Sequence, residues 1–405
     1  MSLNREPWSE TRQIVATMLV GVNPDLPFCI GAPDSLLERG HSIIRDSLTQ
    51  NSSAIIERLT TVRRDRLDRE AQLIERIAKA VPSITGSGRS GGMRLGIGDD
   101  AAILAPGRNT EWVLSCDAFL EGVHFLAKSY PPDSVGYKSL VRAASDLAAM
   151  GAEPRLFLLT LALPARLTGK WLGEFLRGLG RAARLLGMRL AGGDTTTSAT
   201  LSISITVLGE VAIGRAVMRS GARPGDILYV SGRLGRAQLG LALANSGGSG
   251  TLARVLQSQS KLLQPHLYPR IRVELGAWLA RHKIASAMMD VSDGLSTDLA
   301  RLCQASRVGA RLWAERIPCV KLPAARIGLL PKLRLDPMQM ALHGGEDYQL
   351  LFTVSRKQLK RLRSAPSFAE ITAIGEIERG RGITLVGADG HRKRLAPGGW
   401  DPFRR

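Results

Sequence analysis

From about residue 68 onward, hydrophobic residues recur with two different periods, one typical of helices and the other typical of strands. Apolar side chains three and four positions apart predict a helix over 69–80, whereas strict alternation with polar or small residues predicts a strand over 201–211. By the same criteria this first block contains further strands at 112–116 and 155–163 and further helices at 134–150 and 167–187. For the 134–150 helix, Asp133 or Ser134 is the expected N-cap.

A second block of elements follows a turn at Arg223-Pro-Gly-Asp226, where Pro restricts φ and Gly relaxes it. Its predicted strands lie at 227–230, 286–289, 310–314, 348–354 and 371–377, and its predicted helices at 234–244, 269–281, 295–305 and 356–363. The expected fold class is therefore α+β, with two mixed α/β domains at 68–215 and 221–405. Residues 1–67 form an N-terminal extension of unknown role, with little pattern beyond one helix-like stretch.

Composition narrows the class of protein only slightly. A 405-residue chain with 44% hydrophobic and 22% charged residues is typical of a folded protein of more than one domain. Its net charge of +19 favours anionic partners, but its basic runs lack the interleaved aromatic residues of a base-stacking surface. Apolar runs are shorter than a membrane span of about 20 residues, and the N-terminus lacks a secretory pattern. We expect a cytoplasmic protein that binds neither nucleic acid nor membranes.

The four cysteines are far apart and have no histidines at zinc-ligand spacing. A disulfide framework or a structural zinc site is therefore not expected.

The most informative feature is a set of aspartates placed where apolar elements meet Gly or Ser turns. Such a position fixes the carboxylate at a strand end while small neighbours leave room for a ligand. The set comprises Asp99, Asp100, Asp117, Asp194, Asp290 and Asp293, joined by Asp146 from within a predicted helix. Each also has a structural alternative, such as a turn residue or, for Asp293, an N-cap.

Converging carboxylates repel one another unless a counter-charge lies between them. Oxygen ligands without Cys or His suit Mg²⁺, which bridges protein carboxylates to phosphate oxygens. The expected chemistry is phosphoryl transfer, in which the protein mainly positions donor and acceptor. No catalytic side chain is assigned beyond this positioning and metal catalysis.

The sequence contains neither a GxxxxGK[ST] motif nor a GxGxxG motif after a strand. A P-loop enzyme and a protein kinase are thereby excluded. Arg219 is a candidate phosphate contact or a surface arginine, and His124 is a site residue or a structural histidine. Trp400 either closes over a ring-shaped substrate or docks the chain end.

Taken in order, these segments resemble the thiamine-monophosphate kinase family, within the superfamily of aminoimidazole ribonucleotide synthetase, selenophosphate synthetase and a hydrogenase maturation factor. The similar stretches are Gly96-Ile-Gly-Asp-Asp-Ala101, Ser115-Cys-Asp117 through Gly122-Val-His124-Phe125, Ser145-Asp-Leu-Ala-Ala-Met-Gly151, Gly192-Gly-Asp-Thr195, Arg219-Ser-Gly-Ala-Arg-Pro-Gly-Asp226, Asp290-Val-Ser-Asp-Gly294 and Gly344-Gly-Glu-Asp-Tyr348. They cover the chain from about residue 68 to its end.

The resemblance implies ATP as co-substrate, several Mg²⁺ ions, and direct transfer of the γ-phosphoryl group to thiamine monophosphate. It implies a homodimer in which the N-terminal sheets pair into a barrel, with a sandwich-like C-terminal α/β domain completing the substrate site. The implied magnesium positions are Asp100, Ser115, Cys116, Asp117, Asp146, Asp194, Asp290 and Asp293. The implied ATP contacts are Gly193, Asp194, Arg219 and Ser292, and the implied acceptor contacts are His124, Glu346 and Trp400.

The sequence differs from the family pattern at one position, and two alternative functions stand beside the one that the resemblance implies. The family often has threonine at Cys116, and since a neutral thiol is a poor Mg²⁺ ligand, we expect any contact there from the backbone carbonyl. Another ATP-dependent enzyme of the superfamily is the first alternative, although residues 85–92 lack the Cys and Lys of selenophosphate synthetases. A basic nucleic-acid-binding protein is the second, and it leaves the carboxylates unexplained.

Overall fold

The computed structural model describes residues 76–82, 87–90, 93–95, 103–104, 107–245, 261–322, 327–328, 334–364 and 370–403. Residues 76–80 are helical and come first. A small antiparallel sheet follows, made of β1 (Ser87–Ser90), β2 (Met93–Leu95) and β3 (Ile103–Leu104). Two larger sheets follow and carry the rest of the fold. The predicted loop with Asp99 and Asp100 lies outside the described residues.

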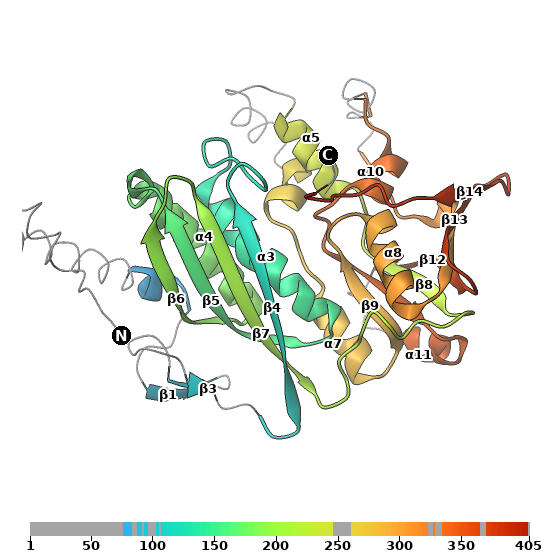
Figure 1. The fold of residues 1–405 in the computed structure, drawn as a ribbon, viewed down its shortest axis with the longest axis horizontal. Coiled ribbons are helices and arrows are strands. Elements are labelled where there is room, and N and C mark those ends of the chain that lie inside the picture. Colours follow the sequence, from blue (N-terminus) through green and yellow to red (C-terminus); the bar gives the residue numbers. More distant parts are fainter. Residues whose placement is uncertain are drawn as a thin grey trace, which may run out of the picture. The chain divides into compact units, whose positions relative to one another are not determined.

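A four-stranded sheet forms the first large layer (Figure 1). Its order is β4 (Thr110–Leu120), β7 (Ser202–Ala212), β5 (Glu153–Leu163) and β6 (Arg189–Thr197). Neighbouring pairs are antiparallel except β5 and β6, which are parallel. Strands β4 and β6 are therefore the two edges of this sheet.

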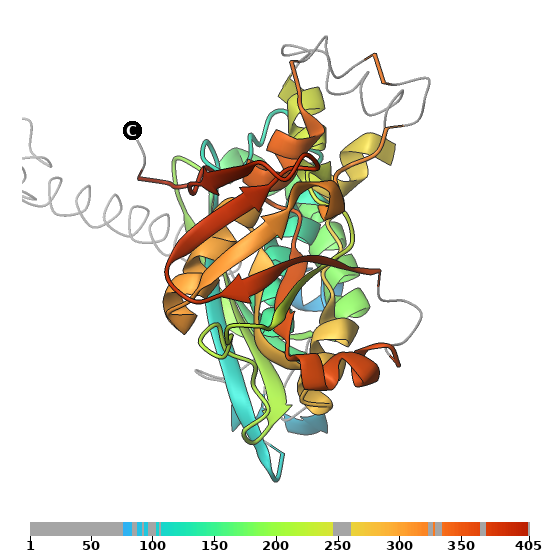
Figure 2. The same ribbon diagram turned by 90° about the vertical axis from the view of Figure 1, so that its right-hand side faces the viewer.

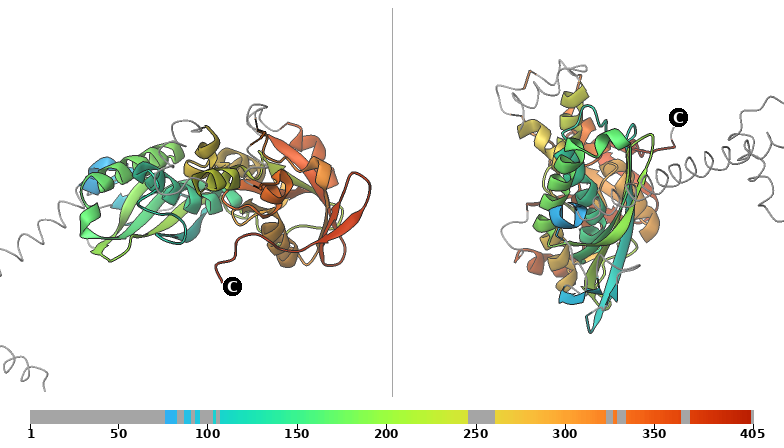
Figure 3. Two further views of the ribbon diagram at one scale, coloured as in Figure 1. Left: turned by 90° about the horizontal axis from the view of Figure 1, so that it is seen from above. Right: turned by 90° about the vertical axis from the view of Figure 1, so that its left-hand side faces the viewer.

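Helices cover one face of this sheet. They are α3 (Pro132–Ala149) and α4 (Lys170–Leu186), and both lie on the same side of the strands (Figure 3). Strand residues such as Phe157 and Ile205 are buried against helix residues such as Leu140 and Leu176. The alternation along β7, with every second residue buried, follows from this one-sided cover.

The opposite face of the four-stranded sheet carries exposed apolar side chains. Leu114 is 64% exposed and Leu158 is 36% exposed, and Trp112 and Leu208 pack on that side around buried Leu156. Within the described residues this face of the sheet is therefore not covered by helices.

A close approach of α3 and α4 depends on glycine. A Cβ on Gly178 would lie 1.8 Å from the carbonyl oxygen of Asp133 in α3, whereas a Cβ on Gly173 of the same helix meets nothing within 4 Å. We therefore expect Gly178→Ala to destabilise the fold by about 3 kcal/mol through overpacking. Gly173→Ala, the matched control, should be neutral or stabilise by up to about 1 kcal/mol. Urea unfolding of both variants measures the difference, and equal midpoints would contradict the close-packing account.

A seven-stranded sheet forms the second large layer (Figure 2). Its strands in spatial order are β14 (Arg392–Leu395), β13 (Gly382–Val386), β10 (Gly309–Trp313), β12 (Ile371–Glu378), β8 (Ile227–Ser231), β11 (Gln349–Val354) and β9 (Ala285–Val291). Its helices are α5 (Arg236–Asn245), α7 (Val273–Arg281), α8 (Leu295–Ser306), α10 (Pro337–His343) and α11 (Leu359–Leu362). Short 3₁₀ turns lie at Ala165–Leu167, Ala314–Arg316 and Arg356–Gln358.

The mixed α/β fold expected from the sequence is confirmed, with differences at particular elements. Strand β6 was not predicted, because a Gly-Gly-Asp-Thr segment is typical of a turn. Strands β13 and β14 and helix α10 were also not predicted. The predicted cap of α3 is wrong: the helix begins at Pro132 without a side-chain cap. Asp133 instead accepts a hydrogen bond from Tyr268 Oη at 2.9 Å.

Two expectations concern membranes and barrels. No helix among the described residues is long and apolar enough to cross a membrane. Within the described part of a single chain, the four-stranded sheet remains open and does not close into a barrel.

Candidate functional site

Three of the predicted acids gather where β4, α3 and β9 meet. Asp117 lies on β4, Asp146 near the end of α3, and Asp290 near the end of β9. Ser115 Oγ donates to Asp146 Oδ2 at 2.5 Å, and Ser145 Oγ donates to Asp290 Oδ2 at 2.7 Å. Two serines thus tie the acids of three different elements into one neighbourhood.

The positions of Asp117 and Asp194 correct the strand-end interpretation. Both lie inside strands, since β4 continues to Leu120 and β6 to Thr197. Successive side chains on a strand point to opposite faces, so Ser115 and Asp117 face the α3 side while the exposed Cys116 thiol lies on the open face. Only the Cys116 backbone is available to a site on the α3 side.

The electrostatics of these acids fit a divalent cation. Burial, and then the charge of Asp146, raise the pKa of Asp290 to about 7. Burial also raises the pKa of Asp146, partly offset by the Ser115 hydrogen bond, and the charge of Asp117 raises it further. Clustered carboxylates that resist ionisation are those that a metal ion stabilises, and all their donors are oxygens.

The described side chains do not enclose such an ion by themselves. Within the described ranges, no three His, Cys, Asp or Glu side chains approach closely enough to hold a metal. The magnesium position predicted at Asp100 lies outside those ranges. Arg219, exposed in the segment between β7 and β8, is close enough for its charge to lower the pKa of both Asp146 and Asp290.

The buried carboxyl of Asp290 predicts a pH dependence of stability. Because its folded pKa is about 7 and its unfolded pKa 3.8, the folded protein holds a proton that the unfolded chain has lost. Between pH 4 and 7 this group makes stability fall as pH rises, by at most about 1.4 kcal/mol per pH unit. Urea unfolding in EDTA should therefore show a shallower decline for Asp290→Asn than for wild type, and parallel curves would refute the assignment.

An arginine binds both carboxylate oxygens of Asp117. Arg142 of α3 donates from Nε to Asp117 Oδ2 at 2.6 Å and from Nη2 to Oδ1 at 3.1 Å. Its guanidinium also lies 5.0 Å from the Phe119 ring centroid. The arginine is 14% exposed and the aspartate 29% exposed. Arg142 therefore neutralises a predicted magnesium ligand.

A second group of predicted residues meets around the start of α8. Trp400 N donates to the Asp293 carbonyl at 2.9 Å, and Glu346 N donates to the Ser292 carbonyl at 2.7 Å. A Cβ on Gly399 would lie 1.9 Å from that same Asp293 oxygen, so the chain end can run this close only through glycine. The Asp293 carboxylate pairs with Arg301 at 2.5 Å.

The N-cap alternative for Asp293 is not what the structure shows. Helix α8 begins after Gly294 without a side-chain cap. Instead Asp298, in the first turn, accepts a hydrogen bond from Asp293 N at 3.0 Å. The Asp293 carboxylate therefore has no capping role and pairs with Arg301 instead.

His124 lies near acids of both groups. Its Nδ1 accepts a hydrogen bond from Leu120 N at 3.0 Å, and its ring lies 5.7 Å from that of Phe119. Burial, then the charge of Arg142, lower the pKa of His124, whereas the charges of Asp117 and Glu346 raise it. His124 therefore lies close enough to both Asp117, a predicted metal ligand, and Glu346, a predicted acceptor contact, for their charges to act on it.

Asp194 and Gly193 are not brought into these groups. They lie on β6, at the edge of the sheet opposite β4. Three strand spacings of about 4.8 Å separate those edges. Asp194 is exposed and makes no hydrogen bond or ion pair within the described part of the chain.

Several ionisable residues of the site were missed from the sequence. They are Lys138 and Arg142 on α3 and His266 in the helical residues 261–267, each in contact with a predicted site acid. Lys138, Arg142 and Asp146 lie four residues apart, which places them on one face of a helix. That spacing was a usable signal, whereas nothing local marks His266.

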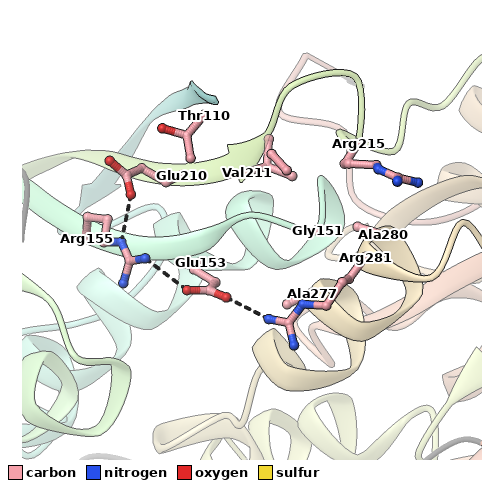
Figure 4. Close-up of a pocket in the computed structure, with 11 residues that line it drawn as sticks. Thr110, Gly151, Glu153, Arg155, Glu210, Val211, Arg215, Ala277, Ala280 and Arg281 are labelled. Carbon is pink, nitrogen blue, oxygen red and sulfur yellow. Dashed lines mark hydrogen bonds and ion pairs between the residues drawn. The ribbon is translucent and has the colours of Figure 1, made fainter. Parts of the chain in front are cut away.

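Two cavities elsewhere contain none of the predicted site residues. One of about 350 Å³ lies where β5 begins and α7 ends (Figure 4). Four of its five charged side chains are paired, because Arg155 contacts Glu153 and Glu210, and Arg281 contacts Glu153. The other, about 1010 Å³, has Arg181, Arg184, Arg270 and Arg272 on its walls.

Comparison with known proteins identifies the family. The AIR synthase related protein N-terminal domain matches residues 98–211, and the C-terminal domain of the same group matches residues 223–388. Thiamine-monophosphate kinase of Bacillus subtilis is 33% identical over 314 residues, covering 76% of this chain and 94% of that protein.

Solved structures agree with the sequence comparison. The crystal structure of thiamine-monophosphate kinase from Stenotrophomonas maltophilia aligns with a TM-score of 0.65 at 37% identity, over 74% of this chain and 92% of that one. A structure described as AaThiL complexed with AMPPCP and TMP aligns with a TM-score of 0.62 at 34% identity, over 76% and 92%. The chain therefore belongs to the thiamine-monophosphate kinase family and is an enzyme of the thiamine-phosphate kinase class.

Proposed function

We propose that the chain transfers the γ-phosphoryl group of ATP to thiamine monophosphate, giving thiamine diphosphate and ADP. The observation that carries the proposal is the gathering of Asp117, Asp146 and Asp290 beside Arg219, a site that suits a metal-bound polyphosphate. The related structure holding AMPPCP and TMP supports the same pair of ligands. The acceptor oxygen attacks directly, and no covalent enzyme intermediate forms.

The residues divide into three proposed roles. Magnesium ions are held by Asp100, Ser115, the Cys116 backbone, Asp117, Asp146, Asp194, Asp290 and Asp293. ATP contacts Gly193, Asp194, Arg219 and Ser292, and the acceptor contacts His124, Glu346 and Trp400. When bound, Mg²⁺ neutralises charge on the phosphates and aligns them for in-line transfer.

The chain's own groups prepare this site before the ligands arrive. A counter-charge beside Asp290 would favour its ionised form, since burial and Asp146 raise the pKa of this carboxyl to about 7. Arg142 donates two hydrogen bonds to the Asp117 carboxylate and holds it in place. Trp400, 49% exposed and fixed through its backbone to Asp293, presents an aromatic face beside the site.

We infer a homodimer whose site draws on both protomers. The open face of the four-stranded sheet carries Leu114 and Leu158, which a second sheet would cover. The register aligns Asp194 through Thr160 and Ser204 with Ala118, so its side chain lies on the open face of the sheet. A site that includes both Asp117, at the β4 edge, and Asp194, at the β6 edge, would take them from different protomers whose edges adjoin. Two sheets joined at both edges would form the expected barrel.

The remaining organisation is likewise an inference from the sequence. We propose an N-terminal ATP- and magnesium-binding domain over 68–215 and a C-terminal domain over 221–405 that completes the substrate site. The turn between them is well formed, because Asp226 Oδ2 accepts a hydrogen bond from Arg223 N at 3.0 Å and Gly225 adopts a φ of +90°. Residues 1–67 remain an extension of unknown role.

An ADP-release assay with ATP, Mg²⁺ and thiamine monophosphate tests the function, with the product identified by mass. Thiamine diphosphate that forms only when Mg²⁺ is present is the expected result. Aminoimidazole precursors and selenide serve as parallel substrates. Turnover with either of these, and none with thiamine monophosphate, would assign the chain to another activity of the superfamily.

A further inference from the structure

A buried cluster lies behind the carboxylate of Glu346, and the sequence did not indicate it. Lys138 Nζ is 2.7 Å from Glu346 Oε2, and His266 Nδ1 is 3.1 Å from the same oxygen. The lysine and histidine side chains are 2% and 1% exposed, whereas that of Glu346 is 25% exposed. Both contacts are to Oε2, and among the described residues Oε1 has no hydrogen-bond or ion-pair partner.

A tyrosine completes the cluster from behind. Tyr130 Oη lies 2.9 Å from His266 Nε2, and the two rings meet edge to face at 5.6 Å. A neutral imidazole with its proton on Nδ1 satisfies both contacts, since it accepts from the tyrosine and donates toward Glu346. Because the Glu346 carboxylate only accepts, it favours the tautomer with the proton on Nδ1, and Tyr130 then donates to Nε2 and holds the ring in place.

The charges of the cluster explain why Glu346 stays ionised. Burial alone would raise the pKa of Glu346, but Lys138 and His266 outweigh burial and hold it well below its usual range. A buried lysine without its acid would be costly, so each charge requires the other. Lys138 Nζ and His266 Nδ1 nevertheless make no aligned hydrogen bond in this state, and both retain donor capacity for a tightened contact.

Helix α3 ties this cluster to the metal-binding acids. Lys138 and Asp146 are two helical turns apart on one face, a rise of about 12 Å along the axis. The same rigid element therefore sets the position of the Glu346 carboxylate and that of the phosphate-binding acids.

We propose that Lys138, His266 and Tyr130 are positioning residues that fix the Glu346 carboxylate for a cationic or hydrogen-bond-donating ring of the acceptor. This inference rests on the proposed function, because thiamine monophosphate carries both a positively charged thiazolium and an amino-substituted pyrimidine. The free oxygen of Glu346 accepts from such a ring, while Oε2 stays held by the protein. The cluster thereby determines acceptor affinity without touching the nucleotide.

Calorimetric binding of thiamine monophosphate and, separately, of an ATP analogue with Mg²⁺ tests the proposal. Losing a hydrogen bond to a charged group weakens binding about 10- to 100-fold. We expect His266→Leu to bind the acceptor about 10-fold more weakly and Lys138→Met more weakly still, with analogue affinity within about twofold. Tyr130→Phe should weaken acceptor binding about threefold.

Tyr137→Phe is the matched control, because this buried tyrosine bonds the Pro269 carbonyl and lies outside the cluster. It should bind both ligands as wild type does. Should Lys138→Met fail to fold, His266→Leu and Tyr130→Phe decide the question. Unchanged acceptor binding, or an equal loss for acceptor and analogue, would overturn the positioning role. A wild-type protein that binds no thiamine monophosphate would instead overturn the proposed function itself.

Discussion

Asp194→Asn should keep the wild-type fold and lose phosphoryl transfer by about a thousandfold. The side chain is exposed and has no partner within the described residues, so its loss costs little stability. Its proposed role as a ligand to magnesium and a contact to ATP predicts the large catalytic effect. Glu315→Gln, an exposed acid on the Ala314–Arg316 turn, removes the same charge and should leave activity unchanged. An active Asp194→Asn enzyme would remove this residue from the site.

The shared site of the proposed dimer can be tested with the same variant. Asp194→Asn and Asp117→Asn chains, each inactive alone, should regain about a quarter of wild-type activity when unfolded, mixed and refolded together. Half of the resulting dimers are mixed, and each mixed dimer has one intact site if Asp117 meets the partner's Asp194. If both aspartates of a site came from one chain, mixing would restore nothing. Separately refolded samples that are then combined provide the control.

Asp117→Asn should lose both activity and stability, because it leaves Arg142 buried without its carboxylate. Removing one member of a buried ion pair costs about 3–5 kcal/mol, and partial exposure of this pair places the expected loss at about 2–3 kcal/mol. Replacing the arginine as well removes the unpaired charge, so Asp117→Asn/Arg142→Met should recover most of that loss. Urea unfolding of both proteins measures the recovery.

Activity separates the two roles of Asp117. A metal ligand is still missing in the double variant, so Asp117→Asn/Arg142→Met should remain inactive despite its restored stability. Recovery of phosphoryl transfer together with stability would show that Asp117 acts only as the partner of Arg142. Arg142→Met alone reports what the arginine contributes without loss of the acid.

Local patterns accounted for most elements of the fold. Strand β7 alternates buried and half-buried residues as its sequence predicts, and β5 and α4 lie within three residues of their expected bounds. The misses have local causes. Strand β6 contains Gly192, Gly193 and three threonines, and only pairing with β5 makes this segment a strand. Helix α3 begins at Pro132 because a proline at the first position needs no hydrogen-bond donor.

The sequence alone determined which residues carry the chemistry. Acids beside Gly and Ser, without Cys or His ligands, indicate magnesium and phosphate at any site where they converge, and their order along the chain identifies the family. These inferences need only residue types and short spacings, so they can be made without coordinates.

Only the tertiary structure decided which of those residues meet. It placed Asp117 and Asp194 on opposite edges of one sheet, turned the Cys116 thiol to the open face, and gave Asp117 and Glu346 their cationic partners Arg142 and Lys138. Strand order and contacts between elements distant in the chain depend on how whole sheets and helices pack, since no short stretch of sequence holds both partners. The acids were therefore predictable, and the arrangement that makes them a site was not.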